Sequence, residues 1–124
     1  MATVLIVDDL IANAQVLARL LRRAGHTAFA VGSGQEALGF VHDHQTDLVL
    51  LDVMMPGMDG IETLRKLRSD PNKSHINILM YSADGAPERI REAQGLGAQG
   101  YIVKGSTSWP QLEATIREHL SPCS

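Results

Sequence analysis

The chain has 124 residues, of which 44% are hydrophobic, and a formal net charge of −3 at pH 7, values typical of one globular domain that buries about two thirds of its unfolded surface. This charge gives no support to binding of nucleic acid or a membrane surface through bulk electrostatics, and no stretch is long and apolar enough for a membrane span or a signal peptide. Because the only cysteine, Cys123, cannot form an internal disulfide, we expect a reducing compartment, the cytoplasm.

Apolar runs with the character of strands alternate with segments of helical periodicity. The expected strands are residues 3–7, 27–31, 48–51, 76–81 and 101–103. The expected helices are residues 10–24, 35–42, 60–69, 84–96 and 108–120. Five such repeats predict an α/β domain with a parallel sheet, helices on both faces and right-handed crossovers.

The last expected helix begins at the sequence Ser-Trp-Pro-Gln, residues 108–111, which resembles a capping box. Trp109 in this sequence either lies exposed for a partner or packs over Tyr101, and the pattern leaves both open. We expect residues 1–120 to form the domain and residues 121–124 to be a C-terminal tail.

Chemically active side chains follow four of the five expected strands. Asp8 and Asp9 follow the first strand, Asp52 the third, Ser82 the fourth and Lys104 the fifth. In an open parallel sheet these ends share one edge, and ligands bind there. Taken singly, each has an ordinary explanation, because a strand-end acid often only caps a turn and a lone lysine is usually solvated. All four together predict a functional site.

The residue types at this edge favour magnesium and phosphoryl chemistry. Three carboxylates within a few Å of one another cannot all ionise cheaply without a cation. An all-oxygen, acid-rich site suits Mg²⁺, and no cysteine or histidine lies near these strand ends to favour zinc. A phosphoryl group held there would need a metal, a positive charge and a hydroxyl donor, and Mg²⁺, Lys104 and Ser82 could supply them. Asp52 would then be the nucleophile that forms an acyl phosphate.

These motifs together resemble the receiver domain of two-component response regulators, and in particular the single-domain chemotaxis type. The motifs are Leu-Ile-Val-Asp-Asp, Leu-Leu-Asp-Val-Met-Met-Pro-Gly-Met-Asp-Gly, Ser-Ala and Gly-Tyr-Ile-Val-Lys. The resemblance extends from Val4 to about Leu120. It implies a flavodoxin-like (βα)5 three-layer sandwich whose five-stranded parallel sheet has the order 2-1-3-4-5.

The resemblance also implies roles for the acids at the sheet edge. Asp52 matches the phosphoacceptor of the family. Asp8 and Asp9, together with Asp52, match the acids that bind Mg²⁺, and the position of Met54 matches a residue whose backbone carbonyl is a further metal ligand.

Three further residues match positions that contact the phosphoryl group or respond to it. Ser82 and Lys104 match the hydroxyl and the lysine that contact it, and Tyr101 matches the aromatic residue that changes position together with the hydroxyl. Two residues depart from the family pattern. Gly105 stands where a proline usually follows the lysine, which leaves a freer loop. Gly100 stands where receivers that dimerise through the face of the fourth helix, fifth strand and fifth helix usually carry Asp, which puts that dimer in doubt.

The leading hypothesis is therefore a signalling domain rather than an enzyme. It would accept a phosphoryl group from a sensor histidine kinase or a phosphotransfer protein onto Asp52, assist its own phosphorylation and dephosphorylation, and relay the signal through the surface of the fourth helix, fifth strand and fifth helix. The sequence shows no output domain, so the target is a downstream protein or an output domain in a longer regulator. Neither nucleic acid nor membrane is expected as a direct partner.

Three other functions remain as alternatives. A degenerate receiver acting as a scaffold is disfavoured by the intact set of acids. An aspartate-nucleophile phosphatase of the haloacid dehalogenase type would need an acid two residues after the nucleophile, where this chain has Met54. A flavodoxin-like cofactor binder would offer donors to a phosphate at the first strand end, where Asp8 and Asp9 would repel it.

Overall fold

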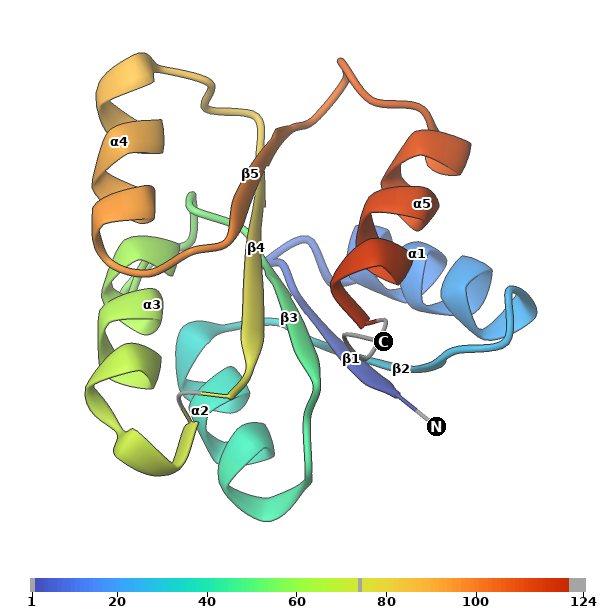
Figure 1. Ribbon diagram of the computed structural model, residues 1–124, viewed down its shortest axis with the longest axis horizontal. Coiled ribbons are helices and arrows are strands. Elements are labelled where there is room, and N and C mark those ends of the chain that lie inside the picture. Colours follow the sequence, from blue (N-terminus) through green and yellow to red (C-terminus); the bar gives the residue numbers. More distant parts are fainter. Residues whose placement is uncertain (1, 74, 121–124) are drawn as a thin grey trace.

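Within residues 2–73 and 75–120, which the computed structural model describes, five parallel strands form one sheet in the order β2-β1-β3-β4-β5 (Figure 1). The strands are β1 (Thr3–Val7), β2 (Thr27–Val31), β3 (Leu48–Leu51), β4 (Asn77–Ser82) and β5 (Gly100–Val103). The helices are α1 (Ile11–Arg23), α2 (Gly34–Asp43), α3 (Gly60–Ser69), α4 (Pro87–Gly95) and α5 (Trp109–Leu120), with a 3-10 turn η1 (Pro71–Lys73). The predicted fold class and strand order are confirmed. The expected tail, residues 121–124, lies outside the described residues.

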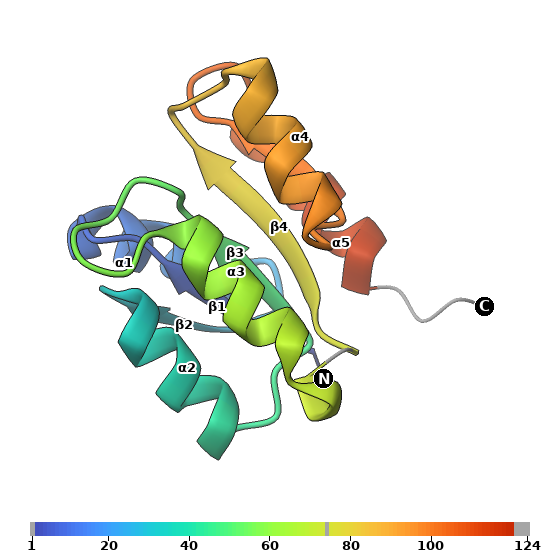
Figure 2. The ribbon, with the colours of Figure 1, turned by 90° about the vertical axis from the view of Figure 1, so that its left-hand side faces the viewer.

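Helices cover both faces of the sheet, so the core has two halves. Figure 2 shows α2, α3 and α4 together on one face, and the side chains they bury there form what we call the α2-α3-α4 core. The other face carries α1 and α5, which bury the α1-α5 core. The central strand β3 serves both, because Leu48 and Leu50 lie in the α1-α5 core while Val49 and Leu51 lie in the α2-α3-α4 core. None of the helices in the described ranges has the length and hydropathy of a membrane span.

The two aromatic residues near the C-terminal end of the chain lie on opposite faces of the sheet. Tyr101 packs against the α2-α3-α4 core, whereas Trp109 packs against the α1-α5 core. Trp109 therefore does not pack over Tyr101, and it is half-buried rather than exposed.

Helix starts follow the capping chemistry of the sequence. At α5 the Ser108 Oγ accepts the Gln111 backbone N–H at 3.3 Å, and the Gln111 Oε1 accepts the Ser108 N–H at 3.0 Å, so the predicted capping box is confirmed. At α2 the Ser33 Oγ accepts the Glu36 N–H at 3.1 Å. This cap starts α2 at Gly34, one residue before the predicted start.

The fourth helix is shorter than the sequence pattern predicts. It begins at Pro87 rather than at residue 84 and ends at Gly95. The reason is local, because the Asp84 Oδ1 accepts the Ala86 backbone N–H at 3.1 Å, which forms a turn ahead of the helix. Because Asp84 lies ahead of the helix, its backbone N–H and carbonyl make hydrogen bonds outside the helix.

Helix α3 starts in direct contact with the end of β3. The Gly60 N–H donates to the Val53 carbonyl at 2.9 Å. A Cβ at Gly60 would lie 2.0 Å from the Asp52 carbonyl oxygen, so only glycine fits this position. The Asp59 carboxylate caps the helix by accepting the Glu62 N–H at 2.9 Å. This close approach fixes the backbone that carries Asp52.

We expect Gly60→Ala to lower the free energy of unfolding by about 2 kcal/mol or more, because its methyl group has to displace backbone atoms. Urea denaturation measures this change. Gly39→Ala is the matched control, since Gly39 lies inside α2 with nothing within 4 Å of its added Cβ. That control should raise stability by about 0.5–1 kcal/mol. Equal effects of the two substitutions would contradict the close-approach argument.

Candidate functional site

Backbone hydrogen bonds bring two buried carboxylates to the same edge of the sheet. The Asp8 N–H donates to the Val31 carbonyl at 3.2 Å, and the Asp52 N–H donates to the Val7 carbonyl at 3.0 Å. Asp8 is 5% exposed and Asp52 is 6% exposed, whereas Asp9 is exposed. Each of the three acids offers an oxygen within 4.8 Å of the other two. The acids that were predicted to converge do converge.

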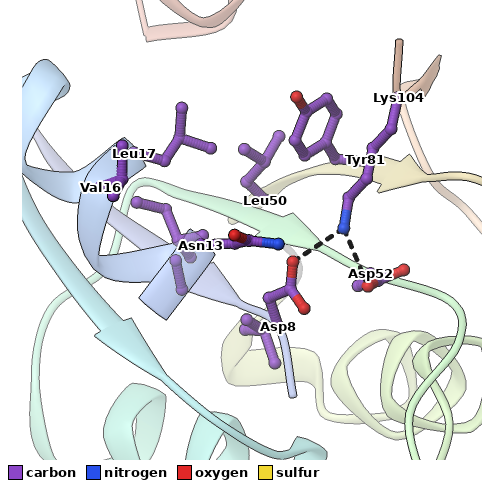
Figure 3. A pocket seen from close by; sticks show the side chains of 11 residues that line it. Asp8, Asn13, Val16, Leu17, Leu50, Asp52, Tyr81 and Lys104 are labelled. Carbon is purple, nitrogen blue, oxygen red and sulfur yellow. Dashed lines mark hydrogen bonds and ion pairs between the residues drawn. The ribbon is translucent and has the colours of Figure 1, made fainter. Parts of the chain in front are cut away.

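The Lys104 ammonium joins the two buried acids. Its Nζ lies 2.7 Å from the Asp8 Oδ2 and 3.1 Å from the Asp52 Oδ2 (Figure 3). The other carboxylate oxygens accept backbone N–H groups, Asp8 Oδ1 from Leu10 at 3.0 Å and Asp52 Oδ1 from Met54 at 3.2 Å. Two carboxylates can be buried side by side here because a positive charge and backbone donors compensate them.

The same contacts keep Lys104 charged. Burial lowers the pKa of its amine, but the hydrogen bonds to Asp8 and Asp52 outweigh burial, and the net pKa is raised above its ordinary value. A positive charge therefore stands beside Asp52 at every pH near neutrality.

The acid cluster fits Mg²⁺ better than a transition metal. Its ligands are all carboxylate oxygens, the donors that Mg²⁺ prefers. Mg²⁺ bonds oxygen at about 2.0–2.1 Å, so small side-chain movements would bring the three oxygens onto one ion. Asp9 is exposed, which leaves room for the water ligands that Mg²⁺ retains. The Met54 backbone N–H donates to the Asp52 carboxylate, which places the residue beside the cluster, and the residue as a whole is 60% exposed.

Ser82 and Tyr101 are linked through the backbone of one loop residue. Ser82 is fully buried at the end of β4, and its Oγ accepts the Asp84 N–H at 3.2 Å. The Tyr101 hydroxyl donates to the carbonyl of the same residue. Burial raises the pKa of the Tyr101 phenol, so this donor keeps its proton. The sequence pairs Ser82 with Tyr101, and the structure adds Asp84 to the pair, because its backbone binds both hydroxyls.

The Asp84 side chain is held separately from its backbone. The Arg89 Nε lies 3.4 Å from the Asp84 Oδ2, and the Arg89 guanidinium also pairs with Glu92 at 2.9 Å. This network connects the loop after β4 to the first turns of α4. Because the groups are partly exposed, the network orients the loop more than it stabilises the fold.

A cavity of about 270 Å³ opens beside the two buried acids, on the α1-α5 side of the sheet (Figure 3). Asn13, Leu17 and Tyr81 line it together with the buried acids and Lys104. Sequence reasoning did not select Asn13 or Tyr81. Tyr81 was available as a polar-tipped residue directly before Ser82, whereas only the helical geometry of α1 brings Asn13 to the cavity.

Comparison with known proteins agrees with this geometry. Residues 4–117 match the family described as the response regulator receiver domain. The chain is 38% identical to the chemotaxis protein CheY of Pseudomonas aeruginosa over 106 residues, which are 85% of this chain and 86% of that protein.

Two solved structures have the same fold. Vibrio cholerae CheY4 has a TM-score of 0.89 and 32% identity, covering 97% of this chain and 99% of that one. The response regulator TrrA of Thermotoga maritima, in complex with Mg²⁺ and BeF, has a TM-score of 0.85 and 28% identity, covering 97% and 100%.

We expect Asp9→Asn to weaken Mg²⁺ binding about tenfold or more, because it removes one negative charge from the acid cluster. Isothermal titration calorimetry with MgCl₂ measures this affinity. Asp43→Asn removes the same charge from the exposed end of α2 and should leave the affinity within error of wild type. Wild-type affinity in Asp9→Asn would remove Asp9 from the set of ligands.

Proposed function

Because the chain belongs to the response regulator receiver family, we propose that Asp52 accepts a phosphoryl group from the phosphohistidine of a sensor histidine kinase or phosphotransfer protein, with Mg²⁺ bound at the acid cluster. The observation that carries the proposal is the Asp52 carboxylate at the sheet edge, 3.1 Å from a lysine ammonium and beside two further acids. Bound Mg²⁺ would supply positive charge to the phosphoryl oxygens.

Phosphoryl transfer requires the protein mainly to position the reacting groups and to supply positive charge. An Asp52 oxygen forms the new O–P bond while the P–N bond of the donor breaks, and the imidazole nitrogen keeps the electron pair. Lys104 is 3.1 Å from the Asp52 carboxylate and donates to the incoming phosphoryl oxygens. Its contact with Asp8, at 2.7 Å, holds the ammonium at the site during the transfer. In this way the domain assists its own phosphorylation.

Transmission of the signal follows from the shared hydrogen bonds of Asp84. The added phosphoryl group brings negative charge and acceptor oxygens, and Ser82 is the neighbouring hydroxyl donor. When the Ser82 hydroxyl turns to the phosphoryl group, the Asp84 N–H loses its acceptor. The loop then shifts, and the Tyr101 hydroxyl follows the Asp84 carbonyl that it binds. The change reaches the α4-β5-α5 surface, which acts on a downstream protein or an output domain.

We place the phosphoryl donor, the downstream target and this protein in the cytoplasm, and we propose residues 1–120 as the receiver domain.

The two alternative functions, a phosphatase and a cofactor binder, gain no support at the site. A haloacid dehalogenase-type phosphatase needs a second acid where Met54 stands, 60% exposed. A cofactor phosphate at the end of β1 would face Asp8 and Asp9.

We expect Asp52→Asn to abolish acyl phosphorylation by acetyl phosphate and MgCl₂, because the amide keeps the shape of the carboxylate and is not a nucleophile. Intact-protein mass spectrometry detects the added phosphoryl group. Asp59→Asn is the control, since asparagine caps α3 as well as aspartate and this variant should be phosphorylated like wild type. A phosphorylated Asp52→Asn protein at the wild-type rate would disprove the central proposal.

For the relay, we expect Ser82→Ala to accept the phosphoryl group but not to transmit it, because the acceptor of the Asp84 N–H is already gone. Two-dimensional NMR compares the free and beryllofluoride-bound proteins. In wild type the signals of Tyr101 and α4 should shift, and in Ser82→Ala these shifts should fall by more than half. Ser106→Ala, an exposed hydroxyl in the loop before α5, should behave as wild type. Equal shifts in Ser82→Ala and wild type would exclude the hydroxyl as the link.

A further inference from the structure

Tyr81 and Lys104 lie on the same face of the sheet, opposite to the face of Ser82. Tyr81 pairs in register with Ile102, and both pack against the α1-α5 core. Side chains alternate between the two faces of a strand, so Ser82 and Tyr101 face the other way. Lys104 stands two residues beyond Ile102 and lines the same cavity as Tyr81.

The two side chains are in contact. The Lys104 Nζ lies 5.4 Å from the centre of the Tyr81 ring, within the distance at which the face of an aromatic ring attracts a cation. Figure 3 shows the ring of Tyr81 and the lysine chain at the wall of the cavity next to the two acids. The ammonium thus has the aromatic ring as a third neighbour in addition to Asp8 and Asp52.

The backbone of Lys104 is fixed at the end of β5, so the orientation of its ammonium depends on its side-chain contacts. Its N–H donates to the Ser82 carbonyl at 2.8 Å, and the Ser106 N–H donates to the Val103 carbonyl at 3.3 Å across the turn that follows. The lysine side chain is flexible and 24% exposed. A ring packed beside its ammonium therefore limits the orientations that the side chain can take.

We propose that Tyr81 is a positioning residue that holds the Lys104 ammonium over Asp8 and Asp52 through a cation–π contact. The role rests on the proposed phosphoryl transfer to Asp52 and adds to it a residue from the opposite face of β4. The ring also covers one side of the cavity, which shields the lysine from water and strengthens its contacts with both acids. An aliphatic residue at position 81 would cover the cavity without attracting the charge.

The first experiment detects the contact in the unphosphorylated protein without Mg²⁺. The chain has three lysines, Lys66, Lys73 and Lys104, so ¹³Cε-labelled lysine gives a simple NMR spectrum. The Hε protons of Lys104 should be shifted upfield by the ring current in wild type and in Tyr81→Phe. In Tyr81→Leu that shift should be lost. A Lys104 signal that does not respond to Tyr81→Leu would disprove the contact.

The second experiment measures the rate of phosphorylation by acetyl phosphate with saturating MgCl₂. Tyr81→Leu should be slower than wild type by about threefold to tenfold, and Tyr81→Phe should stay within about twofold, because it keeps the ring. In a Lys104→Met background, Tyr81→Leu should have no further effect. A wild-type rate for Tyr81→Leu, or the same loss in the Lys104→Met background, would overturn the positioning role.

The two experiments separate this inference from the proposed function. If wild type is not phosphorylated at all, the proposed function fails and the positioning role fails with it, whatever the ring current shows. If wild type is phosphorylated and Tyr81→Leu is equally fast, only the role of Tyr81 fails.

Discussion

The site depends on one electrostatic arrangement, a lysine ammonium between two buried carboxylates. Asp8 and Asp52 are nearly inaccessible, and burying two acids side by side is costly unless a positive charge compensates them. Lys104 supplies that charge from the end of β5, which lies two strands away from β3 in the sheet. A parallel sheet makes this possible, since all its strands end at the same edge. The same local charge balance supports the proposed phosphoryl transfer, because a positive charge is already in place beside Asp52.

The alternation of side chains along β4 and β5 places the residues of the site on both faces of the sheet. Tyr81 and Lys104 lie on the α1-α5 side, where the cavity opens, and Ser82 and Tyr101 lie on the α2-α3-α4 side. Tyr81 and Lys104 can therefore affect the proposed chemistry at Asp52 from one face, while the proposed response passes through Ser82 and Tyr101 on the other. In the proposed mechanism, a substitution at Tyr81 should change the rate of transfer and leave the relay intact, because the Tyr81–Lys104 contact shares no side chain with the hydrogen bonds of Ser82 and Tyr101 to Asp84.

The alternation of strands and helices and the acids at the strand ends could be predicted from local signals in the sequence, whereas the strand order came from the resemblance to receiver domains. The apolar run Leu48–Leu51 ends at Asp52, and this pattern needs no knowledge of the neighbouring strands. The hydrogen bonds of the Asp84 backbone to Ser82 and Tyr101 could not be predicted. They depend on a loop conformation that forms when the Asp84 carboxylate accepts the Ala86 N–H. That same turn delays the start of α4. The contact of Tyr81 with Lys104 depends on the register between β4 and β5. The position of Trp109 depends on which face of the sheet α5 covers. Neither feature can be predicted from the sequence of one segment.

The proposed response at α4 agrees with the small number of residues that this helix buries. Among its residues only Ala93 is buried, whereas α3 buries five residues. Segments with few buried apolar contacts open and shift at the lowest cost in free energy. The loop that carries Asp84 leads directly into this helix, and the Arg89 pair with the Asp84 carboxylate ties the two together. In the proposed relay, α4 is therefore the helix that moves at the lowest cost, whereas α3 is held because its first residue is in close contact with the Asp52 backbone.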